Sequence, residues 1–320
     1  MDGVENLRVV AFGGGTGLPV LLRGLKDRVG DLTAVVTVAD DGGSSGRLRQ
    51  ELGVAPPGDV RNCLVALAGR RRLAEVFNYR FEGGGELSDH TVGNIIIAAL
   101  ADMAGDFCEG VEQAARFLRI DGRVYPAATE SLTLVAAHPD GTISRGESVV
   151  SESGKVISSV SVEPKGAKAP PGVIRAIEEA DVVVFGPGSL FTSTIPSVLG
   201  AGVREALAVF SGPVLYAANV MTQPGETTVF SVSDHLRAIA DHAGPVVTEV
   251  LVHSDPLERT LISRYAAEGA APVELDREAV EDLGVRVLEA DILARDYRGG
   301  VRHDPTKLAG EVCRAVLVRL

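Results

Sequence analysis

Small residues crowd the end of the first apolar segment of the chain. Leu7–Phe12 has the composition of a short strand that is buried on both faces. Five small residues follow it without a gap: Gly13, Gly14, Gly15, Thr16 and Gly17. A glycine-rich turn from a strand into a helix lets backbone N–H groups approach an anion. The run is longer than a tight turn needs, so it predicts phosphate binding rather than a turn without a ligand.

This glycine run matches neither of two common phosphate-binding signatures. Counted from Gly13, the dinucleotide pattern G-x-G-x-x-G would end on Leu18 instead of a glycine. No Lys-Ser or Lys-Thr pair follows at the spacing of a Walker loop. The sequence therefore predicts an anion site of a different type.

A second loop of small and charged residues follows the apolar segment Thr33–Ala39. Its candidate ligand-binding residues are Asp40, Asp41, Gly43, Ser44, Ser45 and Arg47. Hydroxyls and a guanidinium suit a phosphate, whereas Asp40 or Asp41 could hold a sugar hydroxyl or a Mg²⁺ ion. A G-x-S-x-G pattern starting at Gly42 formally matches a nucleophile elbow. Because adjacent aspartates disfavour a developing oxyanion, we do not expect a hydrolase.

Asp59 opens the next helical stretch, directly after a Pro-Pro-Gly segment. Two roles are open for it: it could cap the helix Val60–Leu67, or it could bind a metal ion or a substrate. Asn62 belongs to the same helix start and could project toward a ligand.

Two further strand ends carry residues of the same kinds. Val182–Phe185 runs directly into a third small-residue loop, which holds Gly186, Gly188 and Ser189. Asn219 follows the apolar segment 214–217. Parallel strands open on one carboxyl edge, where α/β sheets bind their ligands. The recurrence at four strand ends indicates a ligand site more strongly than any single loop does.

His90 and Asn94 lie four residues apart, on one face of an expected helix. That face follows the glycine loop 83–85 and could meet the ligand. A structural histidine with satisfied hydrogen bonds explains the pair equally well.

Short apolar segments alternate with helical patterns along most of the chain. This alternation is typical of an α/β protein with β-α units and a mostly parallel sheet. Residues 123–163 differ, because a Pro-Asp-Gly turn separates two apolar segments and 156–162 alternates apolar and polar residues. We expect one α/β domain over residues 1–320, with an antiparallel β excursion at about 123–163.

Composition narrows the class of protein further. The net charge of −12 argues against sequence-independent binding of nucleic acid. The longest apolar helical stretch, Ile95–Met103, is short and contains Asp102, so we expect no membrane span. An acidic N-terminus without a basic segment and three isolated cysteines fit a reducing cytosol. The sequence predicts a cytoplasmic protein with neither nucleic acid nor membrane as a partner.

Together the loops resemble the YvcK/GlmR family of bacteria, whose members are often labelled gluconeogenesis factors. The resemblance spans Arg8 to about Lys307 and rests on VVAFGGGTGLPVLLRGLK, VTVADDGGSSGRLRQELG, PPGDVRNCLVAL, VVVFGPGSLFTS and ANVMTQPGET. The family is similar to CofD, the 2-phospho-L-lactate transferase of deazaflavin cofactor biosynthesis. The resemblance implies a single CofD-like domain with a Rossmann-like, three-layer α/β fold that binds a nucleotide-linked ligand.

The resemblance also implies which ligand is bound. YvcK-like proteins bind UDP-N-acetylglucosamine (UDP-GlcNAc) and influence cell-wall precursor supply, cell shape and growth on gluconeogenic carbon. The diphosphate would lie on Gly13–Gly17 and Gly186–Ser189, and the family's tyrosine and arginine for the UDP-sugar match Tyr265 and Arg302. We expect no covalent cofactor, and we expect a regulatory protein partner and a homodimer.

Two functions of different kinds follow from these residues. The leading hypothesis is a cytoplasmic UDP-sugar-binding regulator of carbon flux. The alternative is a CofD-like transferase that moves a phospholactyl or phosphoenolpyruvyl group from a nucleotide diphosphate to a deazaflavin-type acceptor, or a nucleotidyltransferase. In a transferase the resemblance makes Asp40, Asp41 and Asp59 the catalytic residues and the ligands of a Mg²⁺ ion.

Overall fold

The computed structural model describes residues 3–83, 85, 87–294 and 300–317. At its centre is a sheet of seven parallel strands in the spatial order β10-β9-β8-β7-β1-β2-β3. In chain order these strands are β1 (Arg8–Gly13), β2 (Asp31–Val36), β3 (Arg123–Pro126), β7 (Val182–Phe185), β8 (Val214–Ala217), β9 (Glu249–His253) and β10 (Arg286–Ala290).

The central strands β1 and β7 are apolar because both faces of the sheet are covered. Every residue of β7 is buried, as are Val9 to Gly13 of β1. Phe12 pairs with Phe185 in the parallel register, and their rings pack edge to face with centroids 5.7 Å apart. The two strands therefore end side by side, and the loops that follow them start from neighbouring points.

The strand order identifies where a ligand would bind. From β1 the chain moves outward to β2 and β3, and it then returns to β7 and continues to β8, β9 and β10. The direction reverses between β1 and β7. Open α/β sheets bind ligands in the crevice outside the strand ends at such a reversal. The first and third predicted glycine loops flank this crevice.

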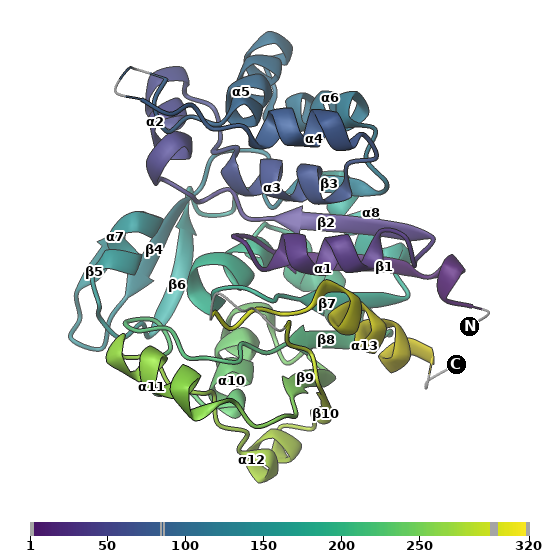
Figure 1. The fold of residues 1–320 in the computed structure, drawn as a ribbon, viewed down its shortest axis with the longest axis vertical. Coiled ribbons are helices and arrows are strands. Elements are labelled where there is room, and N and C mark those ends of the chain that lie inside the picture. The colour runs from purple at the N-terminus through teal and green to yellow at the C-terminus, as the bar shows by residue number, and fades with distance from the viewer. Residues whose placement is uncertain (1–2, 84, 86, 295–299, 318–320) are drawn as a thin grey trace.

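Helices cover both faces of the sheet (Figure 1). In front of it, α1 (Leu18–Leu25) contacts β1, β2 and α13 (Pro305–Leu317). Behind it, α8 (Pro171–Glu179) contacts β1 and α9 (Val203–Val209). The other α-helices are α2 (Gly43–Leu52), α3 (Gly58–Leu67), α4 (Arg71–Asn78), α5 (Val92–Ala104), α6 (Phe107–Leu118), α7 (Glu147–Glu152), α10 (Val232–Ala243), α11 (Arg259–Ala267) and α12 (Arg277–Asp282). These layers confirm the expected Rossmann-like α/β fold.

A three-stranded antiparallel sheet lies on the side of the carboxyl ends of the parallel strands (Figure 1). It consists of β4 (Thr133–Ala137), β5 (Ile143–Arg145) and β6 (Ser159–Glu163), with α7 between β5 and β6. The expected start at residue 123 is too early, because Arg123–Pro126 pairs in parallel with β2 at the edge of the main sheet. The excursion thus contributes one wall at the edge where the ligand loops emerge.

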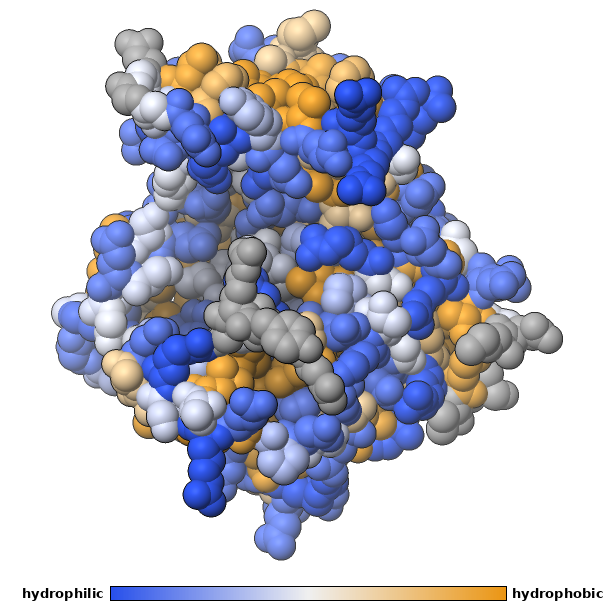
Figure 2. Space-filling view, viewed as in Figure 1, coloured by the Kyte–Doolittle hydropathy of each residue, from blue (hydrophilic) through white to orange (hydrophobic). Residues whose placement is uncertain are grey.

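Apolar side chains gather on the outer surface over α4, α5 and α6, at the upper end of the view in Figure 2. Met103 on α5 is 81% exposed, and Phe117 on α6 is 51% exposed. Among the helices of the described residues, none is both long and apolar enough to cross a bilayer.

Candidate functional site

The loops after β1 and β7 touch each other because glycine allows a close approach. A Cβ atom on Gly17 would lie 2.1 Å from the carbonyl oxygen of Pro187, which is shorter than any real contact. Gly17 is also the last residue before α1. Glycine at this position therefore lets the two loops form a single continuous surface at the start of the helix.

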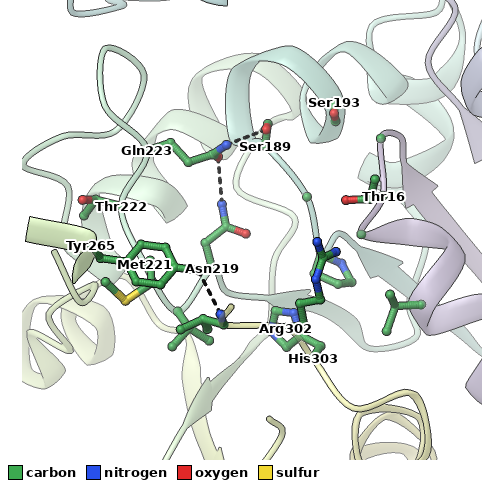
Figure 3. A pocket seen from close by; sticks show the side chains of 17 residues that line it. Thr16, Ser189, Ser193, Asn219, Met221, Thr222, Gln223, Tyr265, Arg302 and His303 are labelled. Carbon is green, nitrogen blue, oxygen red and sulfur yellow. Dashed lines mark hydrogen bonds between the residues drawn. The ribbon is translucent and has the colours of Figure 1, made fainter. Parts of the chain in front are cut away.

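A cleft of about 290 Å³ opens at this surface (Figure 3). Eight residues that the sequence predicts as ligand contacts line it: Gly15, Thr16, Gly17, Gly188, Ser189, Asn219, Tyr265 and Arg302. They come from the ends of β1, β7 and β8, from α11, and from the segment before α13. Gly13, Gly14 and Gly186 shape the two loops but lie outside the lining.

The floor of the cleft contains polar residues that sequence reasoning missed. Asn219 donates Nδ2–H to Gln223 Oε1 over 3.4 Å, and Gln223 donates Nε2–H to Ser189 Oγ over 2.7 Å. The loop after β8 is thereby bonded to the loop after β7, as the dashed lines in Figure 3 show. Gln223 lies in the QPGE part of a segment that carries the family resemblance, which was the available signal.

Tyr265 and Arg302 form the wall at the C-terminal side of the fold. Tyr265 lies on α11, and its hydroxyl accepts a hydrogen bond of 2.8 Å from the backbone N–H of Val301. This bond holds the segment that carries Arg302 against the helix. Figure 3 shows Tyr265 with Met221 on one side of the cleft, and Arg302 with Thr16 on the other.

Among the described residues that line the cleft, Arg302 is the one that carries a positive charge at pH 7. Burial lowers the pKa of His303 to about 4, so this imidazole is neutral at pH 7. Of the 17 lining residues that the structure describes, none is an aspartate, a glutamate or a lysine. One guanidinium, two glycine loops and no carboxylate make the cleft suited to an anion.

A group of carboxyls lies next to the cleft, and we call it the acidic region: Asp40, Asp41, Asp59, Glu147 and Glu226. Asp59 Oδ2 accepts a hydrogen bond of 2.6 Å from Gly15 N–H, which joins the region to the cleft. Burial and the charge of Asp40 raise the pKa of Asp59 to about 6. The helix-cap role considered for Asp59 is wrong, because α3 starts at Gly58 and this carboxylate bonds a different loop.

Asp41 connects the acidic region to the antiparallel excursion. Its Oδ1 accepts a hydrogen bond of 2.8 Å from Ser148 N–H in α7, whereas Asp40 Oδ1 accepts one of 2.9 Å from Gly42 N–H. Glu147 begins α7, and its Oε2 is buried without a partner among the described residues. Burial and the negative charge of Asp59, followed by that of Asp40, raise the pKa of Glu147 to about 9.

The acidic region does not fit a metal site made of protein ligands. In the described part of the chain, no three His, Cys, Asp or Glu side chains converge to hold an ion. Asp40, Asp41 and Asp59 each use one oxygen to accept from a backbone N–H: Asp40 from its own loop, Asp41 from α7 and Asp59 from the loop after β1. Magnesium binding therefore stays a prediction from the sequence.

The remaining predicted contacts lie outside the cleft lining, where they bond each other or neighbouring loops. Ser44 Oγ lies 2.9 Å from His90 Nδ1 and accepts a hydrogen bond of 3.0 Å from Asn94 Nδ2, and all three side chains are buried. Asn94 Oδ1 is buried with no partner among the described residues, and a ligand contact at these three residues stays a prediction. Ser45 Oγ accepts a hydrogen bond from Gly58 N–H, and Arg47 donates one to Ser88 O. The side chain of Asn62 accepts a hydrogen bond from Arg61. Gly43 is the first residue of α2 and adopts a φ of +45°.

Comparison with known proteins agrees with this architecture. The family model "2-phospho-L-lactate transferase CofD" matches residues 9–293. The gluconeogenesis factor of Halalkalibacterium halodurans is 46% identical and aligns over 96% of this chain and 95% of its own. The gluconeogenesis factor of Bacillus subtilis is 42% identical and aligns over 94% of this chain and 96% of its own. The crystal structure of protein BH3568 from Bacillus halodurans superposes with a TM-score of 0.93 and is 44% identical in sequence. The match covers 98% of this chain and 99% of that one.

The fold and the cleft define a doubly wound α/β protein with a crevice at its topological reversal. More particularly, the chain belongs to the CofD family, and within it to the group whose curated members are named gluconeogenesis factors.

Proposed function

We propose that the protein binds UDP-GlcNAc in the cleft and, through this ligand, regulates carbon flux, cell-wall precursor supply and cell shape. The observation that carries the proposal is the pairing of Arg302 with two glycine loops at the strand reversal. An anion held there is neutralised by a guanidinium and by backbone N–H groups. The names of the related gluconeogenesis factors support a role in carbon metabolism.

Each wall of the cleft has a part in this binding mode. The diphosphate lies on Gly15–Gly17 and on Gly188–Ser189, with Arg302 beside it. The ring of Tyr265 packs on the uracil, since an aromatic face suits a planar ring. Asn219 offers an amide for the polar edge of the base or for the ribose.

Regulation requires that the ligand favour one of two states of the protein. Tyr265 holds the segment that carries Arg302 through the hydrogen bond that its hydroxyl accepts from Val301 N–H. A diphosphate that draws Arg302 toward the glycine loops changes this segment, and with it the surface next to α13. A protein partner that recognises this surface would then sense the ligand. That the protein forms a homodimer and is located in the cytoplasm are separate predictions from the sequence.

A second candidate function, group transfer, is favoured by Asp59. With a pKa raised to about 6, this carboxyl is suited to accept a proton near neutral pH. An acceptor hydroxyl would attack the phosphorus of the phospholactyl or phosphoenolpyruvyl group, lose its proton to Asp59, and displace a nucleoside monophosphate. Product formed from such a donor and a deazaflavin acceptor, and lost in Asp59→Asn, would replace the regulator hypothesis.

Calorimetric titration tests the leading proposal. We expect the protein to bind UDP-GlcNAc, and we expect Arg302→Ala and Tyr265→Ala each to weaken binding by about tenfold or more. Arg259→Ala and Tyr79→Ala are matched controls, because these exposed residues lie outside the cleft. No binding by the parent protein, or equal losses in the controls, would contradict the proposal.

A further inference from the structure

A second, smaller cavity adjoins the cleft, and we call it the side chamber. It has a volume of about 220 Å³ and shares Ser189 and Gln223 with the cleft. Because these two side chains bond each other over 2.7 Å, they form the boundary between the two cavities (Figure 3). A ligand that lies on Ser189 in the cleft therefore has the side chamber directly beyond it.

The walls of the side chamber differ from those of the cleft. Val150 on α7 and Ile157 before β6 supply apolar surface, while Ser151 and Thr192 supply hydroxyls. Its lining, as far as the structure describes it, includes no lysine or arginine. A phosphate or carboxylate that entered would lose its water without gaining a cation, which is unfavourable.

Glu226 supplies the charge of the side chamber. Its Oε1 accepts hydrogen bonds from the N–H groups of Phe191 at 2.5 Å and Thr192 at 3.1 Å. Within the described residues no donor bonds its Oε2, so this oxygen can accept from a ligand. Burial raises the pKa of Glu226 to about 7, and its charge also acts on nearby Glu147. The side chamber therefore favours hydrogen-bond donors and disfavours anions.

We propose that the side chamber receives the uncharged, hydroxyl-rich end of a nucleotide-sugar whose diphosphate lies in the cleft. This inference rests on the proposed function and extends it to specificity. Val150 and Ile157 pack on the C–H surface of the sugar, and Glu226 Oε2 accepts from its hydroxyls. The cleft then selects a diphosphate, and the side chamber rejects a ligand that ends in a phosphate or a carboxylate.

Filling the side chamber tests this placement. Ser151 is exposed on α7 and lines the chamber, so Ser151→Phe blocks it without disturbing the core. Val149→Phe on the same helix is the control, because Val149 is 52% exposed and lies outside the lining. By calorimetry, Ser151→Phe should weaken the affinity for UDP-GlcNAc about tenfold and leave the affinity for UDP unchanged. Val149→Phe should change neither affinity. Equal changes for both ligands, or none, would overturn the inference.

A charge readout separates recognition from simple filling. At pH 8, where Glu226 is ionised, the parent protein should bind UDP-glucose about tenfold more tightly than UDP-glucuronate. Glu226→Gln keeps the shape and should reduce this preference to about twofold. An unchanged preference would contradict the inference. If the parent binds neither UDP nor any UDP-sugar, the proposed function itself fails, whereas normal UDP-sugar binding with unchanged ratios removes only the side-chamber assignment.

Discussion

The cleft and the acidic region share a boundary and have opposite electrostatic character. The cleft carries one guanidinium and two glycine loops, while the acidic region brings five carboxyls together. They meet at Gly15, which lines the cleft and donates its N–H to Asp59. The ligand proposed above has two chemically different ends, and this contrast would suit an anionic end in the cleft and an uncharged end beside Glu226.

The cleft and the acidic region also differ in their effect on the stability of the folded protein. The cleft is built from backbone that glycine allows to approach closely, so its backbone N–H groups could face an anion without a buried charged side chain. The acidic region crowds carboxyls whose pKa values burial and mutual repulsion raise. Strongly perturbed carboxyls at a cavity are typical of functional sites, which are maintained at the expense of stability.

The largest effect that would sharpen this comparison is expected at Glu147. Folding raises its pKa from 4.5 to about 9, so the folded state keeps a proton that the unfolded state loses. Its contribution to stability is present below pH 4.5 and is lost as the pH rises toward 9. Glu147→Gln should therefore be more stable than the parent at pH 8, by at most about 5 kcal/mol, and equally stable at pH 4.

Denaturant unfolding at the two pH values measures this difference. Glu152→Gln is the control, since Glu152 is exposed on the same helix. A Glu147→Gln variant that is less stable than the parent at pH 8 would show that the carboxyl is not under electrostatic strain.

A smaller effect of opposite sign is expected in the cleft. Gly17→Ala places a methyl group against the carbonyl oxygen of Pro187, so it should lower the free energy of unfolding by about 2 kcal/mol and abolish ligand binding. Gly85→Ala is the matched control, because a Cβ there meets no atom of the described residues within 4 Å. A Gly17→Ala protein with unchanged stability and affinity would show that the contact between the two loops is unimportant.

The smallest expected effect concerns the hydroxyl of Tyr265. Tyr265→Phe keeps the ring and removes the hydrogen bond to Val301, which should cost about 1 kcal/mol of stability. UDP-GlcNAc affinity should fall about threefold, less than in Tyr265→Ala, because the stacking surface remains. Tyr79→Phe serves as the control. If Tyr265→Phe lost as much affinity as Tyr265→Ala, the hydroxyl and not the ring would carry the binding role.

Much of the architecture followed from local sequence patterns. Val182–Phe185 and Val214–Ala217 are strands with the expected bounds, because fully buried parallel strands are continuously apolar. β3 and β10 were missed, since these edge strands contain Arg123, Arg286 and Glu289 on exposed positions and do not read as apolar segments. An edge strand that is partly exposed contains polar residues, so the continuous apolar segment that marks a buried strand is absent.

The residues of the site also fall into those that sequence patterns indicated and those that they did not. Glycine loops at strand ends indicated the cleft, but Tyr265 and Arg302 came from the resemblance alone, because single polar residues on surface elements carry no pattern. Gln223, Glu226 and Glu147 were missed because tertiary packing brings the loop after β8 and the antiparallel excursion to the crevice. No spacing rule within one segment reports such contacts.

A crystal structure of the protein soaked with UDP-GlcNAc tests the central claim most directly. The account predicts density for the diphosphate along Gly15–Gly17 and Gly188–Ser189, with Arg302 beside it and the uracil on Tyr265. The sugar should extend past Ser189 and Gln223 into the side chamber. A ligand that binds outside the crevice between β1 and β7, or a crevice that stays empty at a saturating concentration, would contradict it.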